Sequence, residues 1–182
     1  MKKKSIRKLV RKKISIILLL GMMTNIIFAD IKLNPNSKQN TTIDRSQNNA
    51  ATIININTPN ERGISVNEFN EFQTKDPVIF NNFGEGIGRS YLAGLMAANP
   101  NLSREQAAQL ILNRVGGNNR VEIENYLEVM SNGKTDVVFS SPNGYYLNNI
   151  GFINFRDVAF TTANVNLDAN GNLMPFGVRG GD

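Results

Sequence analysis

Short runs with alternating apolar and polar positions dominate the chain after residue 51. In TIININ, residues 52–57, Ile54 and Ile56 fall on one face of an extended chain and Asn55 and Asn57 on the other, which is the two-residue period of a half-buried strand. Similar runs follow, each ended by turn residues: 63–72, 76–80, 125–129, 135–140, 151–155, 157–162, 164–167 and 174–178. Many short strands separated by turns predict an all-β domain, built as a sandwich, a barrel or a β-solenoid.

One stretch, LSREQAAQLILNRV at 102–115, does not fit a strand throughout. Ser103 followed by Gln106 is an N-cap signature, and the alanines after it favour a helix by local rules. The alternative is a single turn that leads into a strand over QLILNRV.

The first 29 residues have the layout of a secretory signal peptide. Eight basic residues precede the apolar run ISIILLLGMMTNIIFA, which ends at Ala29, a small residue suited to cleavage. An uncleaved anchor is the alternative, but this run contains Gly21 and Asn25 and is shorter than the roughly 20 residues that span a bilayer. Residues 30–50 are polar and predict a loosely ordered entry into a single domain, 30–182.

Charge and composition narrow the chemistry. Without the leader, 12 basic and 15 acidic side chains remain, so the formal net charge changes from +5 to about −3 and gives no argument for a nucleic-acid partner. The chain has no cysteine and no histidine. Disulfides, a cysteine nucleophile, a Ser-His-Asp triad and metal sites ligated by thiolate or imidazole are therefore excluded.

Asparagine is unusually frequent and is placed after proline. The chain has 28 Asn, and four of its six prolines precede one, at 35–36, 59–60, 100–101 and 142–143. Proline presets the backbone of a turn, Asn tolerates the next position, and an Asn or Ser before the proline bonds the backbone two residues on. NPNL at 99–102 and SPNG at 141–144 therefore predict sharp corners, and Asn side chains stacked in a solenoid can bond along its axis.

Acidic groups are the remaining candidates for acid–base catalysis, and we interpret them as solvated or structural. They are Asp44 beside Arg45, Glu68, Glu71, Glu122, Glu124 and Asp136. The alternating oxygens of Asp168, Asn170 and Asn172 are compatible with calcium, but DANGN is more simply a turn. Phe152, Phe155 and Phe160 predict core or inter-strand packing rather than a ligand platform. No catalytic residue, metal or cofactor is predicted.

Four stretches together resemble the secretion domain of two-partner secretion exoproteins, the family of filamentous haemagglutinin. They are IDRSQNNAATIININTPNERGISVNEFNEF (43–72), ANPNL (98–102), ILNRVGGNNRVEIENYLEV (111–129) and DVVFSSPNGYYLNNIGFINFRDVAFTT (136–162). The parts occur in the family's order and cover nearly all of the chain after the leader.

The resemblance implies a right-handed parallel β-helix (β-solenoid) with short β elements outside the helix. It implies export by the general secretory machinery, followed by recognition by the periplasmic domains of an outer-membrane β-barrel transporter. The family's two Asn-Pro motifs, for transporter recognition or for the turn itself, fall on Asn99, Pro100, Asn101 and Leu102, and on Pro142, Asn143 and Gly144. The chain departs from the family pattern at Ser141, at Tyr145 and at NNIG (148–151), which bears on partner specificity more than on fold.

The resemblance also favours a turn near Ser103 and a strand from about Leu110, ended by Gly116 and Gly117. It implies a non-enzymatic, secreted or cell-surface module at the N-terminus of a longer adhesin, haemolysin or contact-dependent toxin. A stand-alone adhesive or carbohydrate-binding domain is the alternative, which needs exposed aromatics on one face, and Tyr145 and Tyr146 are the one adjacent pair. A polysaccharide-cleaving enzyme would need convergent acidic and basic groups in a cleft.

Overall fold

A computed structural model describes residues 30–174, so the predicted leader 1–29 and most of the predicted strand 174–178 lie outside the described residues. Within that range the chain forms strands and turns, with no helix. The prediction of an all-β domain is therefore confirmed. The strands are β1 (Asp30–Leu33), β2 (Thr42–Arg45), β3 (Thr52–Asn55), β4 (Ile64–Thr74), β5 (Val78–Asn81), β6 (Ile87–Ser90), β7 (Gly94–Ala97), β8 (Leu110–Val115), β9 (Val121–Ile123), β10 (Leu127–Met130), β11 (Thr135–Ser140), β12 (Tyr145–Leu147), β13 (Phe152–Ile153) and β14 (Phe155–Thr161).

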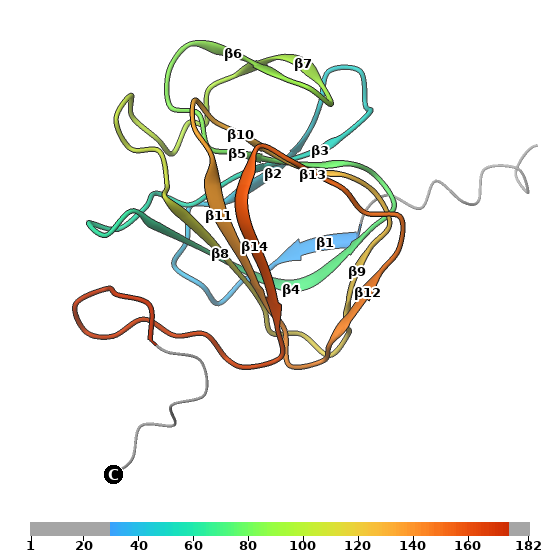
Figure 1. The fold of residues 1–182 in the computed structure, drawn as a ribbon, viewed down its shortest axis with the longest axis vertical. Helices are drawn as coiled ribbons and strands as arrows, with labels where there is room; N and C mark the ends of the chain where they lie inside the picture. Colours follow the sequence, from blue (N-terminus) through green and yellow to red (C-terminus); the bar gives the residue numbers. More distant parts are fainter. Residues whose placement is uncertain (1–29, 175–182) are drawn as a thin grey trace, which may run out of the picture.

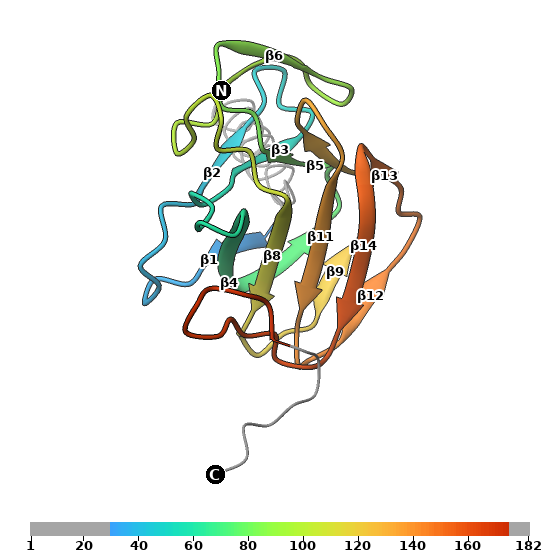
Figure 2. The same ribbon diagram turned by 60° about the vertical axis from the view of Figure 1, so that its left-hand side comes forward.

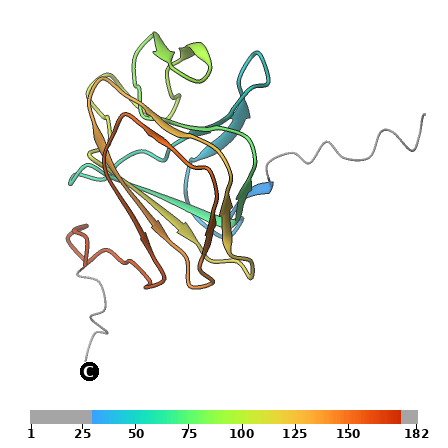
Figure 3. The ribbon, with the colours of Figure 1, turned by 45° about the vertical axis from the view of Figure 1, so that its right-hand side comes forward.

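Most of these strands coil into a parallel β-helix with three faces (Figure 1). The first face joins the start of β4 to β8, β11 and β14, and the second joins the end of β4 to β9 and β12. The third face joins β3, β5, β10 and β13. Every pairing within these faces is parallel, and Figure 3 shows the successive turns of the chain lying over one another. The β-helix implied by the family resemblance is thus observed.

The register repeats from one turn of the helix to the next. Leu110 of β8 pairs with Ile64 of β4 on one side and with Asp136 of β11 on the other. Side chains at equivalent positions therefore stack along the axis, and one turn of the helix buries its apolar face only against its neighbours.

The core fills the inside of the helix with aliphatic residues and a chain of phenylalanines. Phe139 of β11 stacks on Phe160 of β14 with ring centroids 5.2 Å apart, and it meets Phe72 and Phe80 edge-on at 5.3 and 6.0 Å. Because Phe72, Phe80 and Phe139 are fully buried, each contributes roughly 2–3 kcal/mol of hydrophobic stabilisation. The interpretation of Phe160 as an inter-strand packing residue is confirmed.

Residues 30–50 are not a loosely ordered segment, so that prediction is wrong. β1 pairs antiparallel with β4, and β2 pairs antiparallel with β3, which covers the first turn of the helix. Ile31 is buried in the main core, and Thr41 donates to Asn67 Oδ1 at 2.9 Å. The segment is poor in apolar residues because the edges of strands already in the helix supply its backbone partners.

An insertion between β5 and β8, residues 82–109, leaves the helix and returns to it. It carries the antiparallel hairpin β6–β7, which projects beyond the third face (Figure 1). Ser103 and Gln106 do bond as a capping pair, since Ser103 N donates to Gln106 Oε1 at 3.0 Å. No helix follows, because Asn82 bonds both the N–H and the C=O of buried Ala108 and holds the chain extended. The turn near Ser103 and the strand from Leu110 to Val115 are therefore confirmed, and the locally favoured helix is wrong.

After β14 the chain turns back over the outside of the first face (Figure 2). Val165 is buried there against Leu112 and Val138, and Gly171 O accepts a hydrogen bond from Asn60 in the first turn. The predicted strand 164–167 is wrong: this segment makes one isolated bridge, between Leu167 and Leu173. Among residues 30–174 there is no helix that is long and apolar enough to cross a bilayer.

Candidate functional site

The corner NPNL binds the first turn of the helix through Asn99. Its side chain is 1% exposed, and Nδ2 donates to Ile56 O at 3.0 Å and to Asn81 O at 2.8 Å. Asn99 Oδ1 accepts from Asn101 N at 2.9 Å, which is the bond to the backbone two residues on that the sequence predicts. Asn99 therefore ties together the ends of β3 and β5.

The other residues of this corner divide between surface and core. Asn101 Nδ2 donates to Asn40 O at 2.6 Å and to Ile56 O at 3.1 Å, which links the N-terminal segment to the chain after β3. Leu102 is buried in the main core, whereas Pro100 is exposed. The NPNL corner is thus mainly a cross-link within the molecule, with the proline ring facing solvent.

The corner SPNG joins β11 to β12 and lies largely on the surface. Ser141 is fully buried, but Pro142 and Asn143 are exposed. Gly144 has φ +81°, a left-handed conformation that favours glycine, and its N–H donates to Ser141 O at 3.2 Å. Asn143 Nδ2 donates to Gly117 O of the preceding turn.

The two corners do not form one site. Asn99 and Asn101 bond to backbone groups near β3 and β5, whereas Asn143 bonds to the loop after β8. Both corners use the Asn amide to fix a carbonyl of an earlier turn. Both motifs form turns, but the predicted bond from the residue before the proline to the backbone is made by Asn99 and not by Ser141, whose buried hydroxyl has no hydrogen-bond partner among the described residues. Contact with a transporter stays a prediction.

Stacked Asn residues bond along the helix axis, as the sequence suggests. Asn81 Nδ2 donates to Asn55 Oδ1 at 2.9 Å across β5 and β3, and Asn55 Nδ2 donates to Asp44 Oδ2 at 2.7 Å in β2. Inside the first face, Asn67 and Asn113 are register partners and both are fully buried. This ladder connects the N-terminal strands to the helix.

The acidic candidates do not converge on a cleft. Five of them lie in separate ion pairs: Glu68 with Arg114, Glu71 with Lys32, Glu122 with Arg120, Glu124 with Lys75 and Asp136 with Arg156. The hydrogen bond from Arg156 holds the pKa of Asp136 below its ordinary value. Between residues 30 and 174 no group of three acidic side chains is placed to hold a metal ion. Most of these carboxylates therefore pair with bases on neighbouring strands, whereas Glu122 pairs with Arg120, two residues away.

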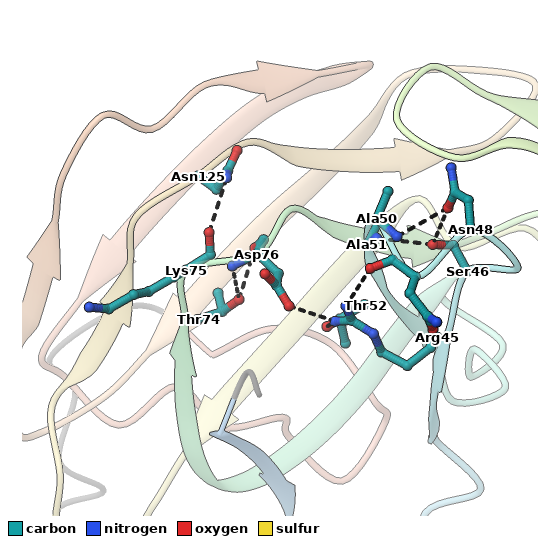
Figure 4. Close-up of polar contacts among 11 residues, drawn as sticks. Arg45, Ser46, Asn48, Ala50, Ala51, Thr52, Thr74, Lys75, Asp76 and Asn125 are labelled. Atoms are coloured by element: carbon teal, nitrogen blue, oxygen red, sulfur yellow. Dashed lines mark hydrogen bonds and ion pairs between the residues drawn. The ribbon is translucent and has the colours of Figure 1, made fainter. Parts of the chain in front are cut away.

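Arg45 pairs with Asp76 rather than with its neighbour Asp44 (Figure 4). Its Nη1 lies 2.7 Å from Asp76 Oδ2 and 2.9 Å from Thr52 Oγ1. Asp76 N in turn donates to Thr74 Oγ1 at 3.0 Å, and Asn125 of the next turn donates to Lys75 O at 3.0 Å. This network joins β2, the corner after β4 and the second turn of the helix. Sequence reasoning missed it because the two charges are 31 residues apart.

The segment DANGN forms the predicted turn. Asp168 Oδ1 accepts from the backbone N–H groups of Asn170 and Asn172 at 2.9 and 2.8 Å. Bonds from the Asn172 side chain and backbone lower the pKa of Asp168. Because these N–H donors already surround the carboxylate, the local geometry is that of a turn.

The adjacent tyrosines face opposite sides. Tyr145 turns inward, and its hydroxyl lies 2.9 Å from Phe139 O and 2.6 Å from Thr161 O, so the two carbonyls share its one proton. Burial raises the pKa of that phenol. Tyr146 turns outward, and the Arg120 guanidinium covers its ring at 4.9 Å from the centroid. The pair therefore does not form the exposed aromatic platform that a carbohydrate-binding domain would need.

A buried carboxylate that sequence reasoning missed anchors the β6–β7 hairpin. Glu128 of β10 is 1% exposed. Its Oε2 accepts from Ser90 Oγ at 2.6 Å and from Leu92 N at 3.0 Å, and Oε1 accepts from Tyr91 N at 2.8 Å. No sequence signal marked it, because Glu128 lies between the core residues Leu127 and Val129, at the strand position that ordinarily faces solvent.

Comparison with known proteins matches residues 29–181 to the family model described as the TPS secretion domain. The 16S rRNA endonuclease CdiA of Enterobacter cloacae is 38% identical over 143 residues, covering 78% of this chain and 4% of that protein. The tRNA nuclease CdiA of Yersinia mollaretii is 36% identical over 143 residues, covering 78% of this chain and 5% of that protein. The chain thus spans about one twentieth of the length of these relatives.

A solved structure, that of the filamentous hemagglutinin secretion domain, matches the fold with a TM-score of 0.66 and 28% sequence identity. The match covers 77% of this chain and 44% of the solved chain. Sequence family and fold therefore agree.

Proposed function

Because the chain belongs to the TPS (two-partner secretion) secretion domain family, we propose that it is the N-terminal targeting module of a larger exported protein. The family match over residues 29–181 carries this proposal. The cargo that would follow is an adhesin, a haemolysin or a contact-dependent toxin, and similarity to CdiA proteins favours the toxin. The module itself acts by being recognised and by folding, not by catalysis.

The export route has two steps. The basic and apolar leader, residues 1–29, directs the chain to the general secretory machinery and is cleaved after Ala29. In the periplasm, the soluble domains of an outer-membrane β-barrel transporter bind the module and pass the chain outward. The protein is then released or held at the cell surface of a Gram-negative bacterium.

The arrangement of the strands supports a role in starting the folding of the exported chain outside the cell. Strands β1 and β2 cover the first turn of the helix by antiparallel pairing, so the helix has a closed beginning. Among the described residues, β12, β13 and β14 each pair on one side only. A free parallel edge is a template for a further strand, so residues that follow can add turns in one direction.

The Asn-Pro corners serve the fold first and recognition second. Asn99 and Asn101 are committed to bonds within the molecule, as described above. Pro142 and Asn143 are exposed and remain available to a partner. Of the two motifs, SPNG is therefore the one that we assign to direct contact.

Secretion in a Gram-negative host tests the proposal. The full chain is expressed with and without its cognate outer-membrane transporter, and the culture medium and periplasm are assayed by immunoblot. We expect cleavage at Ala29 in both strains and release only with the transporter. Equal amounts in the medium of both strains would refute the proposal, as would retention of the chain in the periplasm of both. A matched strain that carries an unrelated outer-membrane barrel controls for leakage.

A further inference from the structure

The β6–β7 hairpin carries the most exposed large apolar side chains of the described chain. Tyr91 is 84% exposed, Ile87 73% and Leu95 71%. The other large apolar residues on the surface reach at most 49%, at Tyr126. Clustered exposure of this kind on one small element marks an interaction site.

The pairing of the hairpin places these residues on its outward side. Ile87 pairs with Ala97, and Arg89 pairs with Leu95, so these four side chains share one face of the two-stranded sheet. Met96 on the opposite side is buried against the helix, and Tyr91 lies in the turn that joins the strands. We call Ile87, Arg89, Tyr91 and Leu95 the hairpin face.

The hairpin is held firmly although it stands outside the helix. Glu128 binds its turn through three hydrogen bonds, as given above. Gly88 lies so close to the helix that a Cβ there would be 2.4 Å from Met130 Cε. A buried carboxylate destabilises the fold unless hydrogen bonds satisfy it. The bonds of Glu128 therefore fix the hairpin in place, although the hairpin contributes little to the core. A rigid apolar face loses little entropy when it binds a partner.

A groove of about 470 Å³ continues the hairpin face towards the helix. Leu95 and Ala97 of β7 line one side, and Ile53 of the third face and Asp44 of β2 line the other. Leu95 belongs to both the groove and the hairpin face. A partner that covers the face can therefore place a side chain or an extended segment in the groove.

The charge of the hairpin face defines the chemistry of its partner. Arg89 is its single charged residue, is exposed, and makes no ion pair with another described residue. A complementary surface is apolar and presents a carboxylate to Arg89. A second copy of this face would instead oppose arginine to arginine across a two-fold axis, which disfavours self-association.

We infer that the hairpin face is a docking surface for the periplasmic region of the outer-membrane transporter, through an apolar patch of that region that carries an acidic residue. The inference rests on the proposed function and adds to it a surface distinct from the Asn-Pro corners. The hairpin lies in the insertion between β5 and β8, outside the repeating turns of the helix. The fold can therefore change this surface without changing its core, as a surface that selects one transporter requires.

Binding of hairpin variants to the transporter tests the inference. The chain is exported by its own leader in a host without the transporter, purified from the periplasm, and titrated with the purified periplasmic region of the transporter. The variants are Arg89→Glu and the triple change Ile87→Ser, Tyr91→Ser and Leu95→Ser. Lys134→Glu is the matched control, because Lys134 is an exposed lysine in the turn after β10 and makes no ion pair with a described residue.

We expect each hairpin variant to weaken binding by about tenfold or more and the Lys134 control to bind like the wild type. Wild-type binding should weaken as salt is raised, and Arg89→Glu should lose that dependence. Circular dichroism and the urea midpoint must match the wild type, which separates lost docking from lost folding.

Three results would overturn the inference. If the wild type binds and both hairpin variants bind equally well, the docking surface lies elsewhere and the proposed function stands. If the wild type itself does not bind, both proposals are refuted. An apparent mass of a dimer that the triple change reduces to a monomer, with transporter binding unaltered, would assign the face to a second copy and also overturn the inference.

Discussion

Replacing Asn99 by alanine should destabilise the whole helix, although the residue lies in a connection outside the strands. The side chain is 1% exposed and makes three hydrogen bonds, to Ile56 O, to Asn81 O and from Asn101 N. Ile56 O keeps a bond from Asn101 Nδ2, but the other two groups lose these bonds. A buried polar group left without a partner costs about 1–3 kcal/mol, and the loss of an ordinary hydrogen bond costs about 1 kcal/mol. Asn99→Ala should therefore lower the free energy of unfolding by about 3 kcal/mol.

Urea unfolding of the chain from Asp30 onward, followed by far-ultraviolet circular dichroism, measures this cost. With a slope of about 2 kcal/mol per molar urea, the midpoint should fall by about 1.5 M. Asn143→Ala is the matched control, because Asn143 is exposed and bonds one carbonyl, that of Gly117. It should cost less than about 1 kcal/mol. Equal midpoints for the two variants, or an unchanged midpoint for Asn99→Ala, would refute the assignment of NPNL as a buried cross-link.

Three further predictions concern other parts of the fold. Gly117→Ala should destabilise the fold by about 2–3 kcal/mol in urea unfolding, because the added Cβ would lie 1.8 Å from Asn70 O. Gly116→Ala is the control and should be near neutral, because no atom lies within 4 Å of a Cβ there. Similar urea midpoints for the two variants would contradict the close approach at Gly117. Glu128→Ala should speed hydrogen exchange of the backbone amides of residues 87–97, because Glu128 bonds the hairpin turn, and should leave the amides of β4 and β8 protected. A uniform loss of protection would show instead that Glu128 stabilises the whole domain. Arg156 lowers the pKa of Asp136 from 3.8, so their pairing should stabilise the fold fully above about pH 4 and lose that effect as the pH falls through the pKa of the folded state. When the urea midpoint is plotted against pH, Asp136→Asn should therefore reduce its fall at acidic pH. An unchanged fall would contradict the pairing.

The repeating part of the fold could be predicted from sequence because each strand carries its own alternating pattern. Ile54 and Ile56 are fully buried, as their shared face predicts, and the strands around Val66, Ile79 and Val137 lie where the apolar runs place them. The β-helix itself required the family resemblance, since alternation alone is equally compatible with a sandwich or a barrel.

Elements that depend on distant partners could not be predicted. β1 and β2 lie in a segment rich in polar residues, and the edges of β4 and β3 supply their backbone hydrogen bonds. Ser103 favours a helix by local rules, but the side chain of Asn82 bonds Ala108, which is 26 residues from Asn82, and prevents the helix from forming. The segment 164–167 has a strand pattern, but Val165 packs on the outer side of the first face instead of pairing in a sheet.

The candidate corners were found by local chemistry, and their contacts were not. Proline followed by asparagine identifies a turn at 99–102 and at 141–144, but not that Asn99 is buried and Asn143 exposed. That difference depends on which turn of the helix lies beside each corner. It separates the structural role of NPNL from the exposed role assigned to SPNG.

Direct binding tests most plainly whether a dedicated transporter recognises this module. Isothermal titration of the purified chain into the periplasmic region of its cognate transporter measures the affinity, with the same region of a transporter from an unrelated system as the control. We expect saturable binding of one module per transporter and no binding to the control. Absence of binding to both, with circular dichroism showing a folded β-rich chain, would contradict it.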